Sequence, residues 1–217
     1  KRTYRSLMNS RVILVSDDRS SLRSPDTLLW PDAACMRGIH TGEWTAHIFE
    51  YAMSFEGNMT QVRELAAANG VGVLHPHGAL ATDPPGLIVC DVDSTVTRTE
   101  AIDLLAECAG NADEVREITA RAMVGELDFT QSLYARVRCL EGLHIGALEE
   151  AWKATVITPG TAELVAAAHD VGAAVGLVSG GFTAIVDPLA EQIRADFAAS
   201  NELEIVDNHL TGRVVGD

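Results

Sequence analysis

The sequence predicts an α/β protein with a doubly wound core, a helical cap inserted after the first core strand, and a small α+β segment in front. Three observations predict this fold class. Residues 87–90 form a continuous apolar run, which is typical of a buried parallel strand. About four helical patterns follow as a block between residues 99 and 157. Strands and helices then alternate again from residue 158, as in a doubly wound sheet.

The composition is that of a globular protein. Of the 217 residues, 47% are hydrophobic and 22% are charged, which excludes wholesale disorder. No run of about 18 apolar residues occurs, so no membrane-spanning helix is expected. The formal net charge is −15, and residues 86–217 carry −14 of it. Such an acidic surface repels nucleic acid and anionic membranes, so the sequence predicts neither as a partner.

Four cysteines are present, and none of them forms a CxxC pair. The even count leaves disulfides open, but Cys90 and Cys108 lie in apolar and helical runs, which favours reduced thiols. The chain opens Lys1-Arg2 without an apolar stretch behind these charges, so no signal peptide is visible. We therefore expect a cytoplasmic protein.

The first 85 residues predict a small α+β segment. Its expected elements, in order, are a strand at 11–15, a loop at 17–32, a strand at 46–55, a helix at 58–68 and a strand at 71–74. The residues from 75 to 86 are rich in proline and glycine and predict a linker. This linker sets the expected domain boundary at residue 85.

The core strand at 87–90 precedes the helical block, in which Phe129, Leu133 and Val137 recur at helical spacing. The expected elements after the block are a helix at 161–171, a strand at 173–178, a tight loop at Ser179-Gly180-Gly181, a helix at 182–197, and strands at 203–206 and 209–215. Asp207-Asn208 predicts a hairpin turn between the last two strands.

Two aspartates, Asp91 and Asp93, follow the first core strand directly. Ligand sites of open α/β sheets lie at the carboxyl ends of the strands. Two carboxylates this close repel each other unless a proton or a cation lies between them, and Mg²⁺ suits such hard oxygen donors. A carboxylate can also attack phosphorus to give an aspartyl-phosphate, while a second carboxyl protonates the leaving alcohol. Taken alone, the pair favours a solvated loop without function over a catalytic site.

Ser179-Gly180-Gly181 follows a second predicted strand and opens a helix. Backbone N–H groups and a hydroxyl in this place can hold a phosphate. A glycine turn needed only for tight geometry is the alternative. No Walker lysine follows, so a P-loop is not expected.

Asp91-Val-Asp-Ser-Thr-Val-Thr97 resembles the first motif of the haloacid dehalogenase superfamily. Six further stretches, at matching spacing, resemble its phosphoserine phosphatase family in particular. They are Glu100-Ala-Ile-Asp-Leu-Leu-Ala, Ile118-Thr-Ala-Arg-Ala-Met-Val-Gly-Glu-Leu-Asp-Phe129, Ser132-Leu-Tyr-Ala-Arg136, Thr158-Pro-Gly160, Leu177-Val-Ser-Gly-Gly-Phe182 and Leu210-Thr-Gly212. The resemblance covers about residues 86–217.

This resemblance implies a haloacid dehalogenase-like core at residues 86–98 and 158–217, with the helical cap at 99–157. Residues 51–75 resemble the end of an ACT-like regulatory domain, so the segment 1–85 is expected to be ACT-like. In the family a lysine and an acidic motif follow the region where this sequence stops. We therefore expect the C-terminal part of the core to be missing from it.

The resemblance also implies a role for each matching residue. Asp91 resembles the nucleophile and a Mg²⁺ ligand, and Asp93 resembles the general acid/base, whose backbone carbonyl also meets the metal. The implied binding residues are Ser179 and Gly180 for the phosphate, Glu100 for the substrate ammonium, Arg136 for its carboxylate, and Met123 and Phe129 as cap residues lining the pocket. Taken alone, Glu100 is also explained as a first-turn acid of a helix, Arg136 as a surface cation and Met123 as cap core.

The implied activity is Mg²⁺-dependent hydrolysis of L-phosphoserine to L-serine and phosphate, as in serine biosynthesis. Two alternatives stay open. One is hydrolysis of another small phosphomonoester or phosphate transfer to a different alcohol. The other is a catalytically incomplete fragment that only binds. The expected partner is the small-molecule substrate, and a homodimer is left open.

Overall fold

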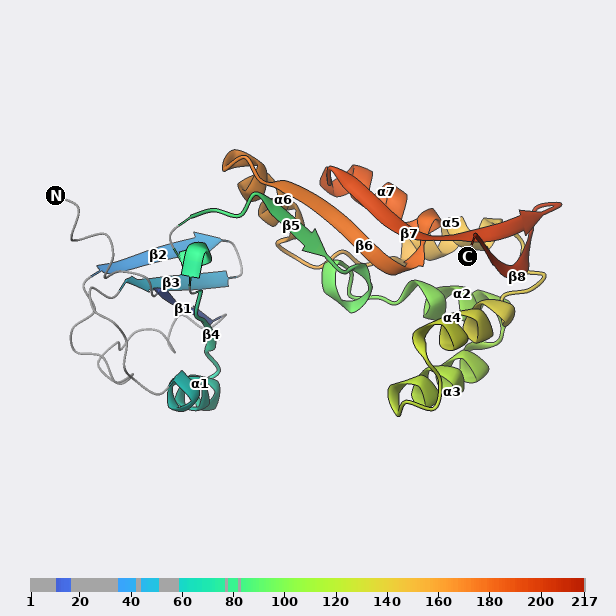
Figure 1. Ribbon diagram of the computed structural model, residues 1–217, viewed down its shortest axis with the longest axis horizontal. Coiled ribbons are helices and arrows are strands. Elements are labelled where there is room, and N and C mark those ends of the chain that lie inside the picture. Colours follow the sequence, from blue (N-terminus) through green and yellow to red (C-terminus); the bar gives the residue numbers. More distant parts are fainter. Residues whose placement is uncertain are drawn as a thin grey trace. The chain divides into compact units, whose positions relative to one another are not determined.

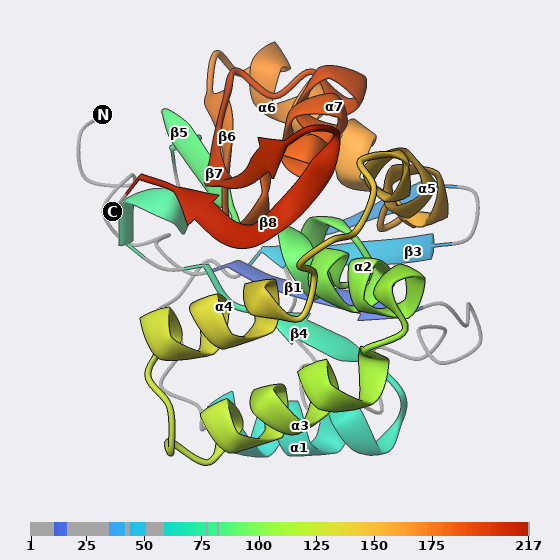
Figure 2. The same cartoon turned by 90° about the vertical axis from the view of Figure 1, so that its right-hand side faces the viewer.

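The computed structural model describes residues 11–16, 35–41, 44–50, 59–76, 78–81 and 83–216. The chain divides into two compact units, residues 1–84 and residues 85–217. Figure 1 and Figure 2 show both units from two sides, with each unit built around its own sheet. The second unit contains every residue to which the sequence assigns chemistry.

The first unit contains an antiparallel sheet with the strand order β2-β3-β1-β4. Its elements are β1 (Arg11–Ser16), β2 (Cys35–Thr41), β3 (Trp44–Glu50), α1 (Met59–Ala68), β4 (Gly72–Leu74) and the short turn η2 (Gly78–Ala81). Val62 and Ala66 are the buried face of α1, and Gly70 ends this helix in the left-handed conformation.

Most of the elements expected in this unit are confirmed where the structure describes them. β1, α1 and β4 lie within a residue of the predicted ranges. The predicted strand at 46–55 corresponds to β3, and its second half, like the predicted loop at 17–32, lies outside the described residues. The sequence did not predict β2, because Gly38 and the mixed polar residues around it give no clean alternation.

The second unit contains a sheet with the order β5-β6-β7-β8. β5, β6 and β7 are parallel, and β8 pairs antiparallel with β7. The strands are β5 (Leu87–Cys90), β6 (Ala174–Phe182), β7 (Phe197–Val206) and β8 (His209–Val215). Asp207 and Asn208 both have positive φ, as expected for a two-residue hairpin turn that follows the strand twist.

Two helices, α6 (Thr161–Asp170) and α7 (Thr183–Ile193), pack on this sheet. Their apolar side chains form one buried cluster with β6 and with the turn that follows β5. Its most buried members are Val92, Val165, Val175, Leu177, Val186 and Leu189. The α/β fold with a largely parallel sheet is therefore confirmed, and Val92 anchors the segment between the two aspartates in the core.

Four helices lie between β5 and α6, and they form the helical insert of this unit. They are α2 (Ala101–Ala109), α3 (Ala112–Met123), α4 (Phe129–Arg138) and α5 (Gly146–Ala154). Both views show α3 and α4 side by side. Leu105, Val115 and Val137 are fully buried in the insert, and the same cluster takes in Phe182 and Leu203 from β6 and β7. The insert is thus packed onto the carboxyl half of the sheet.

Two predictions for this unit are wrong. The helix expected at 182–197 ends at Ile193, and β7 begins at Phe197, six residues before the expected start at 203. The tight loop expected at Ser179-Gly180-Gly181 is part of β6, which continues to Phe182, and α7 begins only at Thr183. The strand continues because the pairing with β7 resumes at Phe182, so the backbone stays extended between the two paired stretches. The pairing of β6 with β7 shifts between Val178 and Phe182, so the segment bulges instead of turning.

Candidate active site

The two aspartates lie at the carboxyl end of β5, in a turn labelled η3 (Val92–Val96). Val92 and Val96 are buried and fix the turn in the core, while Ser94 and Thr95 between them are exposed. The backbone of Asp93 is extended, and Ser94 is left-handed with φ 55°, so the chain reverses immediately after the second aspartate. The carbonyl of Val92 closes the turn, since it accepts hydrogen bonds from the backbone N–H and the hydroxyl of Thr97.

Asp93 joins three elements of the unit. Its Oδ1 accepts a hydrogen bond of 2.8 Å from the backbone N–H of Ala101 at the start of α2. Its Oδ2 accepts a bond of 3.2 Å from the hydroxyl of Ser179 on β6. Burial raises the pKa of Asp93, and the nearby charges of Glu100 and Asp91 add to the rise, although both hydrogen bonds oppose it. A carboxyl with a raised pKa is suited to act as a general acid.

The raised pKa of Asp93 predicts a pH-dependent stability. The stabilisation from the neutral carboxyl is complete below its unfolded pKa and is lost as the pH rises through the higher folded pKa. Above the folded pKa the parent protein therefore holds an unfavourable, partly buried charge, which Asp93→Asn removes. In metal-free buffer we expect the melting temperature of the variant to exceed that of the parent by an amount that grows as the pH rises through the folded pKa of Asp93 and shrinks toward about pH 4. A variant that is less stable than the parent at neutral pH would contradict this assignment.

Ser179 connects Asp93 to the bulged segment of β6. Its hydroxyl oxygen accepts a hydrogen bond of 2.8 Å from the backbone N–H of Gly181 while the hydroxyl donates to Asp93. A Cβ on Gly181 would lie 2.7 Å from Oδ2 of Asp93 and 3.0 Å from Oγ of Ser179, so only glycine fits here. Gly180, by contrast, is exposed. The sequence predicts roles for Ser179 and Gly180 but not for Gly181. The only sequence signal for Gly181 is that it forms the second glycine of the Ser-Gly-Gly motif.

Phe129, the first residue of α4, brings the insert to this segment. A Cβ on Gly180 would lie 2.9 Å from Cζ of Phe129, so the ring rests against the glycine backbone. The side chain of Phe129 is nevertheless 64% exposed, and it borders the site without being buried in the insert. Gly180 therefore lies between the end of the sheet and the insert.

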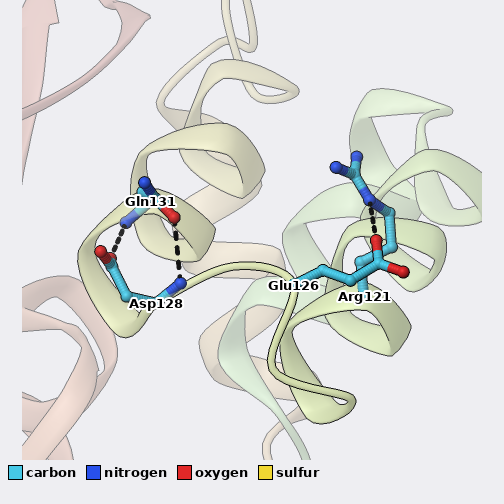
Figure 3. A network of polar contacts seen from close by, with 4 residues as sticks. All are labelled: Arg121, Glu126, Asp128 and Gln131. Carbon is cyan, nitrogen blue, oxygen red and sulfur yellow. Dashed lines mark hydrogen bonds and ion pairs between the residues drawn. The ribbon is translucent and has the colours of Figure 1, made fainter.

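Local polar contacts fix the segment that carries Phe129, as Figure 3 shows. Asp128 caps α4 by accepting from the backbone N–H of Gln131 at 2.8 Å, and the side chain of Gln131 accepts from the N–H of Asp128 at 3.1 Å. Arg121 of α3 forms an ion pair of 3.0 Å with Glu126 in the connecting loop. Such a capping box defines the first turn of a helix, and so it fixes the start of α4 at Phe129.

The other predicted binding residues lie on the helical insert at different depths, and among the described residues no hydrogen bond joins Arg136 or Met123 to the two aspartates or to Ser179. Glu100 is half-buried at the start of α2, and its Oε1 accepts a bond of 2.5 Å from the hydroxyl of Ser94. Arg136 is half-buried on α4, where its Nε donates to the carbonyl of Ser132 at 3.3 Å. Met123 is 84% exposed at the end of α3, so it is not core of the insert.

The charges of Glu100 and Arg136 both act on the pKa of one other side chain, Asp103. Asp103 of α2 has a raised pKa, which burial causes first, followed by the negative charge of Glu100. The positive charge of Arg136 acts in the opposite direction on the same carboxyl. Both groups therefore lie within electrostatic reach of one side chain, on α2 and α4 of the insert.

Hard oxygen donors for a cation are available beside Asp93. Asp91 is exposed, and among the described residues only the hydroxyl of Thr95, at 3.5 Å, donates to its carboxylate. The described residues contain no group of three or more His, Cys, Asp or Glu side chains placed to hold a metal. A carboxylate with free lone pairs suits Mg²⁺, which commonly takes one or two carboxylates and completes its octahedron with waters and substrate oxygens.

In the part of the chain that the structure describes, no helix is both long and apolar enough to cross a membrane. The four helices of the insert and the two on the sheet have at most 12 residues each.

The acidic pair follows β5 and the polar Ser-Gly-Gly segment ends β6, so both lie at the carboxyl ends of neighbouring parallel strands, where ligand sites of open α/β sheets are found. The sequence profile of the haloacid dehalogenase-like hydrolase family matches residues 88–217. The chain belongs to this family.

Curated relatives of the chain include phosphoserine phosphatases. The one from Streptomyces coelicolor is 48% identical over 152 residues, which are 70% of this chain and 37% of the relative. The one from Streptococcus thermophilus is 49% identical over 132 residues, which are 61% of each chain. The chain thus spans about a third to three fifths of the length of these curated relatives.

Solved structures agree with these relatives. A probable phosphoserine phosphatase from Vibrio cholerae superposes with a TM-score of 0.73 and 34% identity, over 95% of this chain and 63% of that one. A phospho-aspartyl intermediate analogue of phosphoserine phosphatase has a TM-score of 0.58 and 40% identity, over 62% of this chain and 64% of that one.

Proposed function

We propose that this chain carries the catalytic domain of a phosphoserine phosphatase, which hydrolyses L-phosphoserine to L-serine and phosphate. The observation that carries the proposal is the environment of Asp93. Its half-buried, hydrogen-bonded carboxyl has a raised pKa and lies two residues after an exposed carboxylate, Asp91. One group is thus suited to hold a proton and the other to attack, which is the division of labour that hydrolysis through an aspartyl-phosphate needs. The phosphoserine phosphatase relatives support the same reaction.

In the proposed first step, a carboxylate oxygen of Asp91 attacks phosphorus and forms an aspartyl-phosphate. The bond from phosphorus to the seryl oxygen breaks, and Asp93 gives its proton to that oxygen, so serine leaves with a neutral hydroxyl. In the second step Asp93, now a carboxylate, takes a proton from water as the water oxygen attacks phosphorus. The acyl-phosphate bond breaks, phosphate leaves, and both aspartates return to their first state.

We propose that the carboxylate of Asp91 and the backbone carbonyl of Asp93 would hold Mg²⁺. When bound, the ion neutralises negative charge on the phosphoryl oxygens. The hydroxyl of Ser179 and the backbone of Gly180 are proposed to hold the same oxygens from the side of β6. Their place beside Asp93 supports this role, because the phosphate must lie within reach of the acid.

The remaining roles concern the ammonium and carboxylate groups of phosphoserine and the apolar lining of the pocket. Glu100 is proposed to meet the ammonium group and Arg136 the carboxylate, because each is the charged side chain that complements that group. Met123 and Phe129 are proposed to line the pocket from the insert, which serves as the cap. Their exposure supports this, since the apolar side chains of both are left uncovered by the insert itself.

The role of Arg136 predicts a change in substrate preference. A lysine has a single charged nitrogen and cannot form the two parallel bonds of a guanidinium to a carboxylate. We expect Arg136→Lys to raise KM for L-phosphoserine roughly 10- to 100-fold. The kcat/KM for O-phosphoethanolamine, which has no carboxylate, should change little.

Arg138, two residues further along α4 and exposed, offers the matched control. Arg138→Lys should leave both substrates unaffected. An equal loss on both substrates in Arg136→Lys would show that Arg136 supports the fold of the insert and does not recognise the carboxylate.

A substrate panel tests the proposed function as a whole. Phosphate release with Mg²⁺ is measured for L-phosphoserine, O-phosphoethanolamine, phosphoglycolate and p-nitrophenyl phosphate. We expect the highest kcat/KM for L-phosphoserine. A higher value for another ester would favour a related phosphatase, and release of its alcohol without free phosphate would favour a phosphotransferase. Binding of L-phosphoserine by calorimetry with no turnover would favour a chain that binds without catalysis.

Further proposals concern the first unit, the location of the protein and its oligomeric state. The strand order β2-β3-β1-β4 with α1 supports an ACT-like, ferredoxin-like segment at 1–85, because that fold pairs its strands in this order. Among the described residues Cys90, Cys108 and Cys139 are free thiols, which supports the predicted cytoplasmic location. A homodimer stays a prediction.

A further inference from the structure

We propose that Asn201 of β7 is a positioning residue that fixes the Ser179-Gly180-Gly181 backbone and, through it, the acid Asp93. The inference rests on the proposed function, because it takes Asp93 as the proton donor of that reaction. Asn201 touches neither aspartate, and nothing in the sequence pattern singles it out.

The bulge in β6 creates the need for such a residue. Val178 pairs with Ala199 and Phe182 with Asn201, so three residues of β6 stand opposite the single residue Ser200 of β7. An irregularity of this kind leaves backbone groups without their usual partners in the sheet. A backbone carbonyl without a hydrogen-bond partner next to a core raises the free energy of the folded state. It also leaves the orientation of its peptide plane unrestrained.

The side-chain amide of Asn201 supplies the missing donors. Its Nδ2 donates to the carbonyl of Gly180 at 2.9 Å and to the carbonyl of Gly181 at 3.3 Å. A primary amide has two N–H groups, so one side chain can satisfy both carbonyls. Glycine has the greatest backbone freedom of any residue, so hydrogen bonds from another segment are the main restraint on the peptide planes of Gly180 and Gly181.

A peptide plane transmits this restraint to the acid. The carbonyl of Gly180 and the N–H of Gly181 belong to one rigid plane, so a bond to the first aims the second. That N–H donates to Oγ of Ser179 at 2.8 Å, and the hydroxyl of Ser179 donates to Asp93 at 3.2 Å. Asn201 therefore orients the hydroxyl that bonds the acid, and the same plane presents the neighbouring backbone to the phosphate.

The test compares two variants that remove the donors. Asn201→Leu keeps a similar volume, and Asn201→Asp keeps the shape but replaces the N–H groups by an oxygen that repels both carbonyls. For L-phosphoserine we expect kcat to fall roughly 10- to 100-fold, because a misplaced acid slows proton transfer. KM should stay within about threefold, since Asn201 does not touch the substrate.

Asn111 provides the matched control. Its Nδ2 also donates to a backbone carbonyl, that of Cys139 at 2.7 Å, but within the helical insert. Asn111→Leu should lower the melting temperature as the Asn201 variants do and leave kcat unchanged. Amide hydrogen exchange gives a second readout, in which Gly181 should lose protection only in the Asn201 variants.

The outcomes separate this inference from the proposed function. Unchanged kcat in both Asn201 variants, or a loss no greater than in Asn111→Leu, would overturn the positioning role while the parent still hydrolyses phosphoserine. If the parent shows no turnover, the proposed function fails, and hydrogen exchange alone tests whether Asn201 restrains the Gly180-Gly181 backbone. Loss of protection at Gly181 in the Asn201 variants would then support this restraint, and unchanged protection would overturn it.

Discussion

Replacing Asp91 by asparagine is expected to abolish phosphate release from L-phosphoserine, lowering kcat by about ten-thousand-fold or more. The amide has nearly the same shape as the carboxylate, but it carries no charge and does not attack phosphorus. Because Asp91 is exposed and bonded only weakly to Thr95, the substitution should leave the melting temperature close to that of the parent. Initial rates of phosphate release, with circular dichroism melts alongside, measure both quantities.

Asp187, an exposed acid on α7, is the control for the loss of one negative charge in the same unit. Asp187→Asn should retain the parent kcat. Full activity in Asp91→Asn would show that another group is the nucleophile and would overturn the proposed mechanism.

The second large effect is expected at Gly181. Gly181→Ala places a methyl group 2.7 Å from Oδ2 of Asp93 and 3.0 Å from Oγ of Ser179, closer than atoms pack. Asp93 can move away only by breaking its bonds to Ala101 and Ser179. We expect kcat to fall by about a hundredfold or more, since a displacement near 1 Å at a reacting group costs about that much.

Gly86, which precedes β5, has open space around its Cα and no left-handed backbone, so it supplies the control. Gly86→Ala should leave kcat and the melting temperature unchanged. If Gly181→Ala kept the activity of Gly86→Ala, the contact between Asp93 and Ser179 would not be needed for catalysis. A crystal structure of the variant with Asp93 unmoved would contradict the steric reason for the prediction.

The sequence predicted the order of the core elements well, because their signals are local. The apolar run at 87–90 and the helical spacing of Phe129, Leu133 and Val137 are patterns that burial produces within one element. The hairpin turn at Asp207-Asn208 depends on two residues that tolerate positive φ. Such features need no knowledge of what the element packs against.

The prediction failed where structure depends on pairing between distant segments. Ser179-Gly180-Gly181 has the composition of a loop, yet the segment stays extended, because β7 and the Asn201 side chain hold it. The β2 strand is defined by its pairing with β3 and not by its own alternation. A register shift is not visible in either strand alone.

The candidate site divides in the same way. Asp91, Asp93 and Ser179 belong to short motifs and could be found from the sequence. Gly181 and Asn201 could not, since their roles come from a Cβ that would not fit and from two carbonyls some 20 residues away along the chain. The raised pKa of Asp93 also arises from burial, which no local pattern reports.

The central claim is that Asp91 accepts the phosphoryl group of L-phosphoserine, and trapping that intermediate tests it most directly. The chain is mixed with Mg²⁺ and L-phosphoserine, quenched in acid within the first turnovers, and digested for peptide mass spectrometry. We predict one added phosphoryl group on the peptide that contains Asp91, absent from Asp91→Asn and lost on longer incubation as phosphate appears. Hydrolysis of phosphoserine with the phosphoryl group on another residue, or no phosphoryl transfer at all, would contradict the account.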